Sequence, residues 1–441
     1  MNMPNNSIRG ILRHLDFSSF SYLRKIDLSN NSLYGILPAN IFNLSKLSYL
    51  DLGYNDFSGM IPPEIGFLKN LEYLLLDHTR FSGFLPQELG MLESLLVLSV
   101  QATNLTGTIP ASIGLFLSKN TLIGSIPTSF GNLTNLESLY LHTNSLSGPI
   151  PWEIWSLTHL MDVDLGINYL AGEIPASIGD SGNLLFLSLC GNRLSGSIPS
   201  SIGNLTKLNT LYLCENGFYG PIPPSFGNLK SLADMRLFSN KLNGSLPVEL
   251  ENITNCKIKI TCLKMSNNNL FGSIPFEIGN ASNLQLLDLS SNHFRGKIPR
   301  ILDSLKLLFE LDFSGNELSG VIPSQLGMLS ALAKLNLAAN HLSGIIPEQI
   351  GQLVQLLGLN LSKNMLKGNI PSNFGSLRFL QNMDLSQNML NGEIPWQLGR
   401  LQRLEAMNLS HNKFIGSIPS SFNQCISLSF VDISNNQLIG R

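Results

Sequence analysis

The sequence predicts an α/β repeat solenoid in which one long parallel β-sheet forms a concave face and irregular or 3-10 segments form the convex face. Two observations support this fold class. A 24-residue pattern, L-x-x-L-x-L-x-x-N-x-L-x-G-x-I-P-x-x-I-x-x-L, recurs almost from end to end, as in residues 23–46 and 332–355. In addition, 17 of the 22 prolines occupy one slot of that pattern. A fixed period of this length is typical of solenoids, in which each copy packs only on its neighbours.

The ninth slot of the pattern fixes the register of the copies. Asn fills this slot from Asn31 to Asn436, except in two copies where Thr79 and Thr103 replace it, and Asn6 fills the matching slot of a partial first copy. We therefore count about 19 copies in a single domain that covers residues 1–441. Neither a linker nor a charge run nor a low-complexity segment interrupts them.

Each slot has a physical role. The L-x-x-L-x-L stretch alternates apolar and polar residues, which predicts a short strand with Leu335 and Leu337 inward and Asn336 outward. Because one such strand is not stable alone, it pairs with the same segment of the next copy. The slot-nine Asn satisfies backbone groups in the following turn. The Gly suits a bend, and the I-P pair supplies a buried side chain and a residue without an N–H.

Two steps break the period. From Thr103 to Asn120 the step is 17 residues, and from Asn240 to Asn268 it is 28. Since a coil needs about 24 residues to close, the short step predicts a local kink or a poorly packed coil at 110–120. The long step predicts an insertion near 251–262 that bulges outward at little entropic cost.

Composition and scattered chemistry exclude several function classes. The net charge is −2 and charged residues make up 13% of the chain, which argues against nucleic acid or an anionic membrane as partner. We expect no signal peptide and no membrane-spanning segment, since no apolar run is long enough. The seven histidines stand singly, and we find no nucleophile–base pair and no phosphate loop. We therefore expect no enzyme activity, no cofactor and no metal site.

The five cysteines leave several pairings open. Cys190 and Cys214 occupy the same outward slot of neighbouring copies, so their Cα atoms should lie about 5 Å apart, which suits either a disulfide or two free thiols. Cys256 and Cys262 flank the insertion, which they either close with a disulfide or leave open. Cys425 fills an inward Leu slot, so we expect a buried thiol.

Eleven N-x-S/T sequons occur in the chain. A repeat rich in Asn and Ser also generates sequons without any role in glycosylation. Five of them share one slot of the convex face, where a glycan is tolerated. We predict glycosylation at these five: Asn43, Asn132, Asn204, Asn252 and Asn280.

The outward slots of the predicted strands carry the candidate binding surface. In the last third of the chain these slots hold Asp, Asn, Ser and Ala, whereas copies three to eleven depart from that default. Aromatic side chains interleaved with charges are typical of binding hot spots, although neutral drift of surface positions is the alternative. The candidate residues are Tyr73, Asp77, His78, Gln101, Phe116, Tyr140, His142, Asp162, Asp164, Phe186, Tyr212, Glu215, Asp234, Arg236, Phe238 and Lys264.

This surface predicts a groove for an extended peptide or a protein loop. A peptide that runs across successive strands meets one set of side chains per copy. The aromatic side chains supply contact area, and Arg236 or Lys264 can pair with an acidic group or a C-terminal carboxylate.

The L-S-G-x-I-P core, as in residues 194–199 and 342–347, resembles the plant-specific class of leucine-rich repeats. Residues 15–35 resemble the start of the array in receptor kinases with long ectodomains. The resemblance implies an ectodomain fragment of a plant receptor-like kinase at the extracellular face of the plasma membrane. It would bind a peptide or protein ligand and a co-receptor kinase near its C-terminal copies. A kinase-less receptor-like protein, a secreted enzyme inhibitor and an inactive truncated gene product are the alternatives.

The resemblance also implies segments that the sequence does not show. Receptors of this family carry a signal peptide, a cysteine-paired cap, a transmembrane helix and a kinase, whereas V-A-I-K, H-R-D-L-x-x-x-N and D-F-G do not occur in the chain. A bare solenoid end exposes apolar side chains at a cost on the order of 10–15 kcal/mol. We therefore expect this chain to be a truncated part of a longer receptor.

Overall fold

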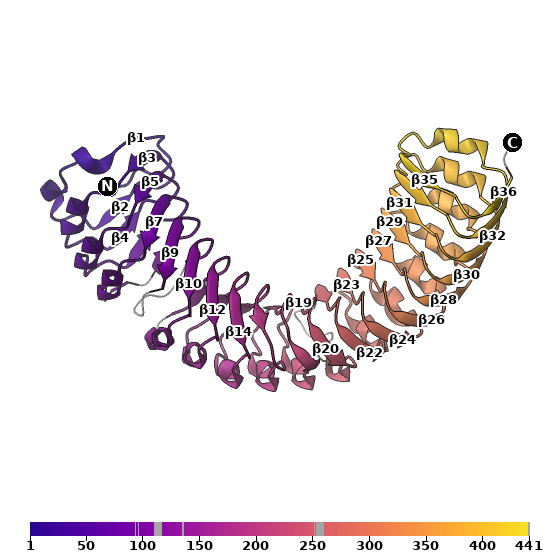
Figure 1. The fold of residues 1–441 in the computed structure, drawn as a ribbon, viewed down its shortest axis with the longest axis horizontal. Helices are drawn as coiled ribbons and strands as arrows, with labels where there is room; N and C mark the ends of the chain where they lie inside the picture. The colour runs from indigo at the N-terminus through magenta and orange to yellow at the C-terminus, as the bar shows by residue number, and fades with distance from the viewer. Residues whose placement is uncertain are drawn as a thin grey trace. The chain divides into compact units, whose positions relative to one another are not determined.

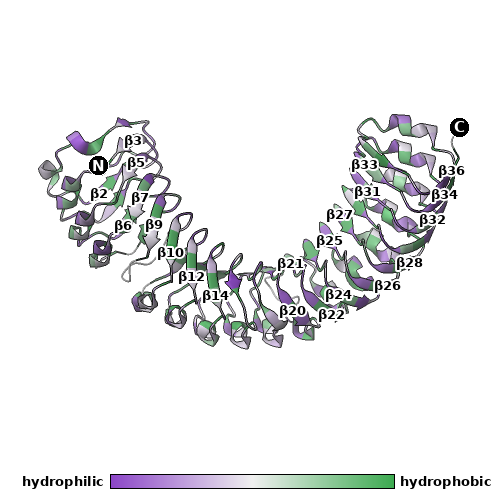
Figure 2. Cartoon of the chain, viewed as in Figure 1, coloured by the Kyte–Doolittle hydropathy of each residue, from purple (hydrophilic) through white to green (hydrophobic). Residues whose placement is uncertain are grey.

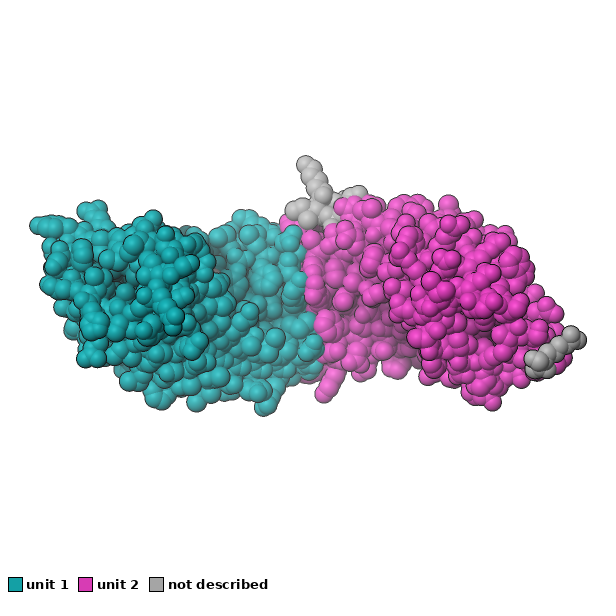
Figure 3. Space-filling model, turned by 90° about the horizontal axis from the view of Figure 1, so that it is seen from above, with its two compact units in different colours: residues 1–217 teal, residues 218–441 magenta. Residues whose placement is uncertain are grey.

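The computed structural model describes residues 1–92, 94–95, 97–109, 117–134, 136–250, 252 and 260–439. It divides into two compact units, residues 1–217 and residues 218–441 (Figure 3). Each unit is a stack of similar coils, and each regular coil contains a first strand, a second strand and a 3-10 segment (Figure 1). The repeat solenoid predicted from the sequence is confirmed in both units, whereas the prediction of a single domain stays a prediction.

The L-x-x-L-x-L segments form the first sheet, which is parallel as predicted. Strands pair slot for slot, so that Leu139 lies opposite Val163 and Val163 lies opposite Leu187. In unit 1 the strands follow the orders β2-β4-β6-β8 and β11-β13-β15-β17. Their bounds are β2 (Lys25–Asp27), β4 (Tyr49–Asp51), β6 (Tyr73–Leu75), β8 (Val97–Ser99), β11 (Ser138–Tyr140), β13 (Asp162–Asp164), β15 (Phe186–Ser188) and β17 (Thr210–Tyr212).

Unit 2 continues the same strand pattern within its own coils. Leu311 lies opposite Leu335, and Leu335 lies opposite Leu359, all of them buried. The strands follow one another in chain order. Their bounds are β19 (Asp234–Arg236), β21 (Cys262–Lys264), β23 (Leu286–Asp288), β25 (Glu310–Asp312), β27 (Lys334–Asn336), β29 (Gly358–Asn360), β31 (Asn382–Asp384), β33 (Ala406–Asn408) and β35 (Phe430–Asp432).

A second parallel sheet, which we did not predict, is built from the N-x-L-x-G segments. The segment alternates like a strand, since Ser32 is exposed, Leu33 is buried and Tyr34 is exposed. In unit 1 the strands are β1 (Arg9–Gly10), β3 (Ser32–Gly35), β5 (Asp56–Gly59), β7 (Arg80–Phe84), β9 (Asn104–Thr108), β10 (Thr121–Gly124), β12 (Ser145–Gly148), β14 (Tyr169–Gly172) and β16 (Arg193–Leu194).

The second sheet has the same form in unit 2. There the strands are β18 (Tyr219–Pro221), β20 (Lys241–Gly244), β22 (Asn269–Ser273), β24 (His293–Gly296), β26 (Glu317–Val321), β28 (His341–Gly344), β30 (Met365–Gly368), β32 (Met389–Glu393), β34 (Lys413–Gly416) and β36 (Gln437–Leu438). The glycine that ends most of these strands has a positive φ, as at Gly344 (φ +81°), where a side chain would strain the backbone.

The 3-10 segments close the coils and mostly start directly after the proline of the I-P pair. In unit 1 these are η1 (Leu12–His14), η2 (Phe17–Phe20), η3 (Ala39–Asn43), η4 (Pro63–Phe67), η5 (Gln87–Met91), η6 (Thr128–Asn132), η7 (Trp152–Ser156), η8 (Ala176–Asp180) and η9 (Ser200–Asn204). In unit 2 they are η10 (Pro224–Asn228), η11 (Val248–Leu250), η12 (Phe276–Asn280), η13 (Arg300–Ser304), η14 (Ser324–Met328), η15 (Glu348–Gln352), η16 (Ser372–Ser376), η17 (Trp396–Arg400) and η18 (Ser420–Gln424). Figure 2 shows apolar and polar residues alternating within the coils.

The slot-nine asparagine joins neighbouring coils through its buried amide. The Asn364 Nδ2 donates to the carbonyl oxygens of Leu337, Leu361 and Ser362 at 3.0–3.2 Å, and its Oδ1 accepts from the Leu342 N–H at 3.0 Å. These four hydrogen bonds link the end of one first strand to the next coil and to the second sheet. The turn role predicted for this residue is confirmed, and it extends across coils.

The short step leaves the flanking coils in regular register. Residues 110–116 lie outside the described part, but Leu117 is fully buried and Asn120 Nδ2 donates to the carbonyls of Val100, Leu117 and Ser118. The pairing of Leu122 with Gly107 matches the register of regular coils. The kink or poorly packed coil predicted at 110–120 stays a prediction, because residues 110–116 are not described and the buried Ser118 Oγ has no hydrogen-bond partner among the described residues. Most of the predicted insertion at 251–262 also lies outside the described part, and Asn243 and Asn269 still pair across it.

Candidate functional site

The outward residues at the start of unit 1 form a contiguous cationic and aromatic row. Lys25 Nζ lies 4.1 Å from the centroid of the Tyr49 ring and 3.4 Å from Asp27 Oδ2. The rings of Tyr49 and Tyr73 are 5.7 Å apart. Tyr73 was a predicted site residue, whereas Lys25 and Tyr49 were not, although all three occupy the same slot. The slot itself was the signal that would have identified them.

Beside this row lies an open depression of about 400 Å³ with acidic walls. It is lined by Asp51, Tyr54 and Asp77, among others. Burial raises the pKa of Asp51, and the carboxylates of Asp27 and Asp77 raise it further, against the hydrogen bond from the Gly53 N–H. Carboxylates gathered in this way favour a positively charged ligand group, which would relieve their mutual repulsion.

Three further predicted residues surround this depression. The His78 ring stacks on Tyr54 with centroids 4.3 Å apart. The Asp77 carboxylate accepts hydrogen bonds from Ser99 Oγ at 2.6 Å and from the Gln101 N–H at 2.7 Å. His78 has a φ of +50°, so its side chain leaves the strand at a left-handed turn.

The middle of unit 1 brings together predicted residues from β11 to β17. Tyr140 pairs with Asp164, and Asp162 pairs with Phe186 across neighbouring strands. The Phe186 and Tyr212 rings meet edge to face at 5.8 Å. These aromatic side chains are half-buried, because they lie against one another instead of standing free in solvent.

Burial perturbs the titrating groups of this cluster. It raises the pKa of Asp162 and also that of Tyr140, to which the charges of Asp162 and Asp164 contribute. A cation placed between Tyr140 and the two carboxylates would therefore be stabilised by charge and by the ring. His142 lies beside this cluster with its Nδ1 3.1 Å from Thr143 Oγ1, and Glu215 is exposed at a left-handed turn (φ +54°).

A disulfide between Cys190 and Cys214 crosses two coils on the same face. Their Cα atoms are 4.6 Å apart, so the disulfide is the correct one of the two alternatives. Cys214 is buried and Cys190 is partly exposed. Cys190 follows Phe186 in one coil, and Cys214 follows Tyr212 in the next. The disulfide covalently fixes the coils that carry the aromatic pair.

Unit 2 begins with the remaining predicted residues. Arg236 forms a fork with Asp234, with Nε–Oδ1 at 3.1 Å and Nη2–Oδ2 at 2.8 Å. Asp234 occupies the Nε–Nη2 edge of the guanidinium, and the predicted pairing of Arg236 with a ligand carboxylate stays a prediction. Lys264 makes no ion pair with the described residues and keeps that role. Phe238 is half-buried in its outward slot.

Of the four remaining predicted residues, two are described and two are not. Phe116 and Cys256 lie outside the described residues. Cys262 is a free thiol, and burial raises its pKa to about 12. Cys425 is a buried free thiol that contacts the Leu398 carbonyl, as predicted for a core position.

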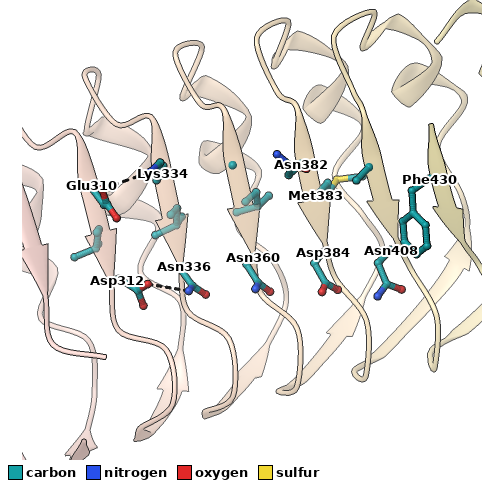
Figure 4. A pocket seen from close by; sticks show the side chains of 15 residues that line it. Glu310, Asp312, Lys334, Asn336, Asn360, Asn382, Met383, Asp384, Asn408 and Phe430 are labelled. Atoms are coloured by element: carbon teal, nitrogen blue, oxygen red, sulfur yellow. Dashed lines mark hydrogen bonds and ion pairs between the residues drawn. The ribbon is translucent and has the colours of Figure 1, made fainter. Parts of the chain in front are cut away.

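A hollow of about 360 Å³ lies over the C-terminal copies, where no binding residues were predicted. Gly358 and Ala406 leave space between Lys334, Asn382 and Phe430, as Figure 4 shows for the labelled side chains. A row of amides and carboxylates borders the hollow: Asp312, Asn336, Asn360, Asp384 and Asn408.

Two contacts hold the walls of this hollow. Asn336 Nδ2 donates to Asp312 Oδ2 at 2.9 Å, and Lys334 pairs with Glu310 at 3.7 Å. The hollow was not predicted from the sequence, because the candidate residues were chosen for large side chains. The sequence signal for it is Gly358, a glycine in an outward slot.

Models of the leucine-rich repeat match residues 21–81 and ten further copies between residues 135 and 425, which together exceed half of the chain. The chain belongs to the leucine-rich-repeat family. No curated protein sequence matches this leucine-rich-repeat chain.

Among solved structures, the chain is similar to ectodomains of plant receptor kinases. The chain is 34% identical to the ectodomain of the Arabidopsis thaliana receptor kinase GASSHO1/SCHENGEN3, solved with CASPARIAN STRIP INTEGRITY FACTOR 2, with a TM-score of 0.86 over 99% of this chain and 56% of that one. It is 34% identical to the Arabidopsis receptor kinase HAESA, solved with the peptide hormone IDA and the co-receptor SERK1, with a TM-score of 0.83 over 100% of this chain and 78% of that one. The chain thus spans just over half of the first of these ectodomains.

The repeat is also similar to a bacterial protein. The Leptospira interrogans protein LIC12759 is 28% identical, with a TM-score of 0.68 over 96% of this chain and all of that one. Among the described residues, no helix is long and apolar enough to cross a membrane. The same residues contain no group of three or more His, Cys, Asp or Glu arranged to hold a metal ion.

Proposed function

We propose that this chain is the ligand-recognition part of a plant receptor kinase ectodomain and binds a peptide on its first-sheet face, outside the cell. The observation that carries the proposal is the 34% identity over nearly the whole chain to ectodomains solved with a named ligand, such as HAESA with IDA. The chain itself has no catalytic role in this function. A co-receptor kinase that contacts the C-terminal copies is the second partner we propose, by similarity to the HAESA complex.

The chemistry of the first-sheet face supports a peptide with basic groups. In unit 1 the outward slots carry Asp51 and Asp77 in one depression and Asp162 and Asp164 beside Tyr140. Lysine or arginine side chains, or an N-terminal amine, would pair with these carboxylates while aliphatic segments cover the aromatic rings. The predicted site residues of unit 1 are thus proposed ligand contacts.

In unit 2 the hollow over Gly358 supports a different kind of contact. The amides of Asn336, Asn360 and Asn408 present both donors and acceptors along its border. A peptide backbone needs the same pairing of donors and acceptors, and Phe430 offers apolar contact at one end. Lys264 remains the proposed partner of a ligand carboxylate.

The test begins with a phage-displayed library of random linear peptides selected on the immobilised chain. We expect enriched peptides to contain basic residues and to lose at least about tenfold in affinity when Tyr140 and Tyr212 are both changed to alanine. The matched control changes Ser290, which is outward but borders neither this cluster nor the hollow over Gly358, to alanine. Unchanged affinity in the tyrosine variant, with a folded protein by circular dichroism, contradicts the proposed site.

A further inference from the structure

Three arginines border an open hollow of about 800 Å³ in unit 2, at the side where the 3-10 segments η16 to η18 turn back towards the first strands. The guanidinium groups belong to Arg378, Arg400 and Arg403, and no carboxylate lines the hollow. This surface is formed by the last residues of the 3-10 segments and by residues that follow them, and not by the outward slots of the first sheet. It is therefore separate from the surface to which we assign peptide binding.

Two of these guanidinium groups lie against aromatic rings, and none of the three has a carboxylate partner among the described residues. Arg400 Cζ lies 4.9 Å from the centroid of the Trp396 ring, and Arg403 Cζ lies 4.8 Å from that of Phe379. No ion pair involves either of them, or Arg378, within the described ranges, and all three are exposed. Like charges gathered without a partner repel each other, so a bound anion would stabilise them.

Two other exposed arginines each pair with a carboxylate. Arg80 pairs with Asp56 at 2.7 Å, and Arg295 pairs with Glu317 at 2.8 Å. Arg193 and Arg300 are likewise exposed without an ion pair among the described residues, so the hollow is distinguished by three arginines that gather there with no carboxylate in its lining.

The repeat does not require arginine in these slots. The slot of Arg400 holds Asn132, Asn204 and Asn280 in other coils, and the slot of Arg378 holds Thr134 and Ser282. Packing therefore does not explain the arginines, because the coils with small polar residues in these slots close in the same way. At this surface three arginines are concentrated on two adjacent coils.

We propose that this hollow binds an acidic oligosaccharide through its carboxylate groups. Arginines on adjacent coils, about 4.8 Å apart along the stack, match a ligand with several anions at short intervals better than a single anion. The guanidinium fork pairs with a carboxylate through two hydrogen bonds. Between the cations, the side chains of Gln402, Gln424 and Ser376 offer donors and acceptors that suit sugar hydroxyl groups.

The test measures binding of a purified oligogalacturonate to the full chain by isothermal titration calorimetry at low salt. The variant Arg378→Gln/Arg400→Gln/Arg403→Gln should bind at least about tenfold more weakly. The matched control, Lys69→Gln/Lys230→Gln/Lys306→Gln, removes three charges from the slot of Arg378 in other coils and should change affinity less than about twofold. Arg403→Lys keeps the charge but loses the fork, so it should fall between the two.

Salt and competing probes complete the test. Affinity should fall as sodium chloride is raised, because the attraction is electrostatic and screened. A neutral oligosaccharide of the same length should not bind. The proposal is overturned if the arginine variant binds oligogalacturonate as well as the unaltered chain, if the lysine variant loses as much, or if polyglutamate binds as tightly as oligogalacturonate, which would indicate an acidic protein surface as partner. None of these results depends on whether the first-sheet face binds a peptide.

Discussion

The slot-nine asparagine shows how one residue type holds a repeat together. Asn340 is 6% exposed, and its amide makes hydrogen bonds with Phe313, Leu337, Ala338 and Leu318 at 2.9–3.2 Å. The sequence identified this residue by its period alone. The bonds to the preceding coil could not be predicted, because they depend on which backbone groups the neighbouring coil leaves unpaired.

Replacing Asn340 should therefore be costly. Asn340→Ala leaves the Leu318 N–H and the carbonyl oxygens without their partner, which should lower the free energy of unfolding by on the order of 3 kcal/mol. Asn340→Thr should cost less, because Thr79 keeps one such bond, from its Oγ1 to the Leu76 carbonyl at 2.8 Å. Urea denaturation followed by circular dichroism measures both. Equal destabilisation by the two variants would contradict the role assigned to the amide.

The Cys262 thiol offers a second test at the residue scale. Burial, together with the neighbouring Asp234 carboxylate and against the charges of Arg236 and Lys264, raises the pKa of this thiol to about 12. Because only the thiolate reacts, alkylation of Cys262 at pH 8 should be on the order of a thousand-fold slower than that of a free cysteine. The rate should rise with pH throughout the range in which the protein stays folded.

Asp234→Asn should speed this reaction, since removing the carboxylate lowers the thiol pKa. Mass spectrometry of peptides after timed treatment with iodoacetamide gives the rates, with a free cysteine peptide as reference. An alkylation rate like that of the reference would show that Cys262 is not shielded.

At the scale of elements, the two sheets differ in how well the sequence predicts them. The first sheet follows from the alternation of Leu slots, as in Leu335 and Leu337. The second sheet has the same alternation over four residues, as in His341–Gly344, but its N-x-L-x-G segment contains one leucine slot, whereas the L-x-x-L-x-L segment contains three. Its strands are held mainly by hydrogen bonds to neighbouring coils, which a pattern within one copy does not contain.

The short step between Thr103 and Asn120 provides an element-scale prediction. The Ala102 N–H donates to the Ser118 carbonyl at 3.1 Å, and the Leu117 N–H donates to the Tyr140 carbonyl at 2.8 Å. These bonds match those of regular coils, such as the Thr143 N–H to the Gly166 carbonyl at 2.9 Å. Hydrogen exchange at Ala102 and Leu117 should therefore be as slow as at Thr143.

Exchange measured by mass spectrometry on overlapping peptides checks this. Asn120→Ala is the matched perturbation, because it removes the amide that bridges the step. The Asn120 Oδ1 accepts a hydrogen bond from the Leu105 N–H at 3.2 Å, so this substitution should speed exchange at Leu105. Fast exchange at Leu117 in the unaltered chain would indicate that the coils separate at the step.

At the scale of the molecule, the same coil recurs in both units and only its surface changes. The large side chains that predicted a site, such as Tyr140 and Phe186, lie together in the structure as expected from their shared slots. The hollow over Gly358 was not predicted from the sequence, because it forms where Gly358 has no side chain between Lys334 and Asn382 of the neighbouring strands. The arginine hollow was not predicted from the sequence, because its arginines occupy slots for which the repeat pattern specifies no residue type.

The distribution of glycosylation sequons over the whole chain leads to a last prediction. Asn43, Asn132, Asn204 and Asn280 are each the exposed last residue of a 3-10 segment, away from the first sheet within their unit (Figure 1). Asn252, the fifth predicted site, is exposed as well. Glycans at these positions would leave the first-sheet face bare.

Two other sequons lie in that face. Asn360 and Asn408 border the hollow over Gly358, and their Oδ1 atoms accept hydrogen bonds from Ser362 and Ser410. A glycan on either would fill the hollow to which we assign ligand contacts. If a eukaryotic cell secretes the chain, intact-mass analysis should show one glycan lost for each of Asn43→Gln, Asn132→Gln, Asn204→Gln and Asn280→Gln, and none lost for Asn360→Gln or Asn408→Gln. Peptide affinity should survive all four of the first substitutions, because none of these residues touches the first-sheet face. A glycan found on Asn408 of a chain that still binds its selected peptide would remove the hollow from the ligand site and leave the aromatic and acidic cluster of unit 1 as its only proposed location.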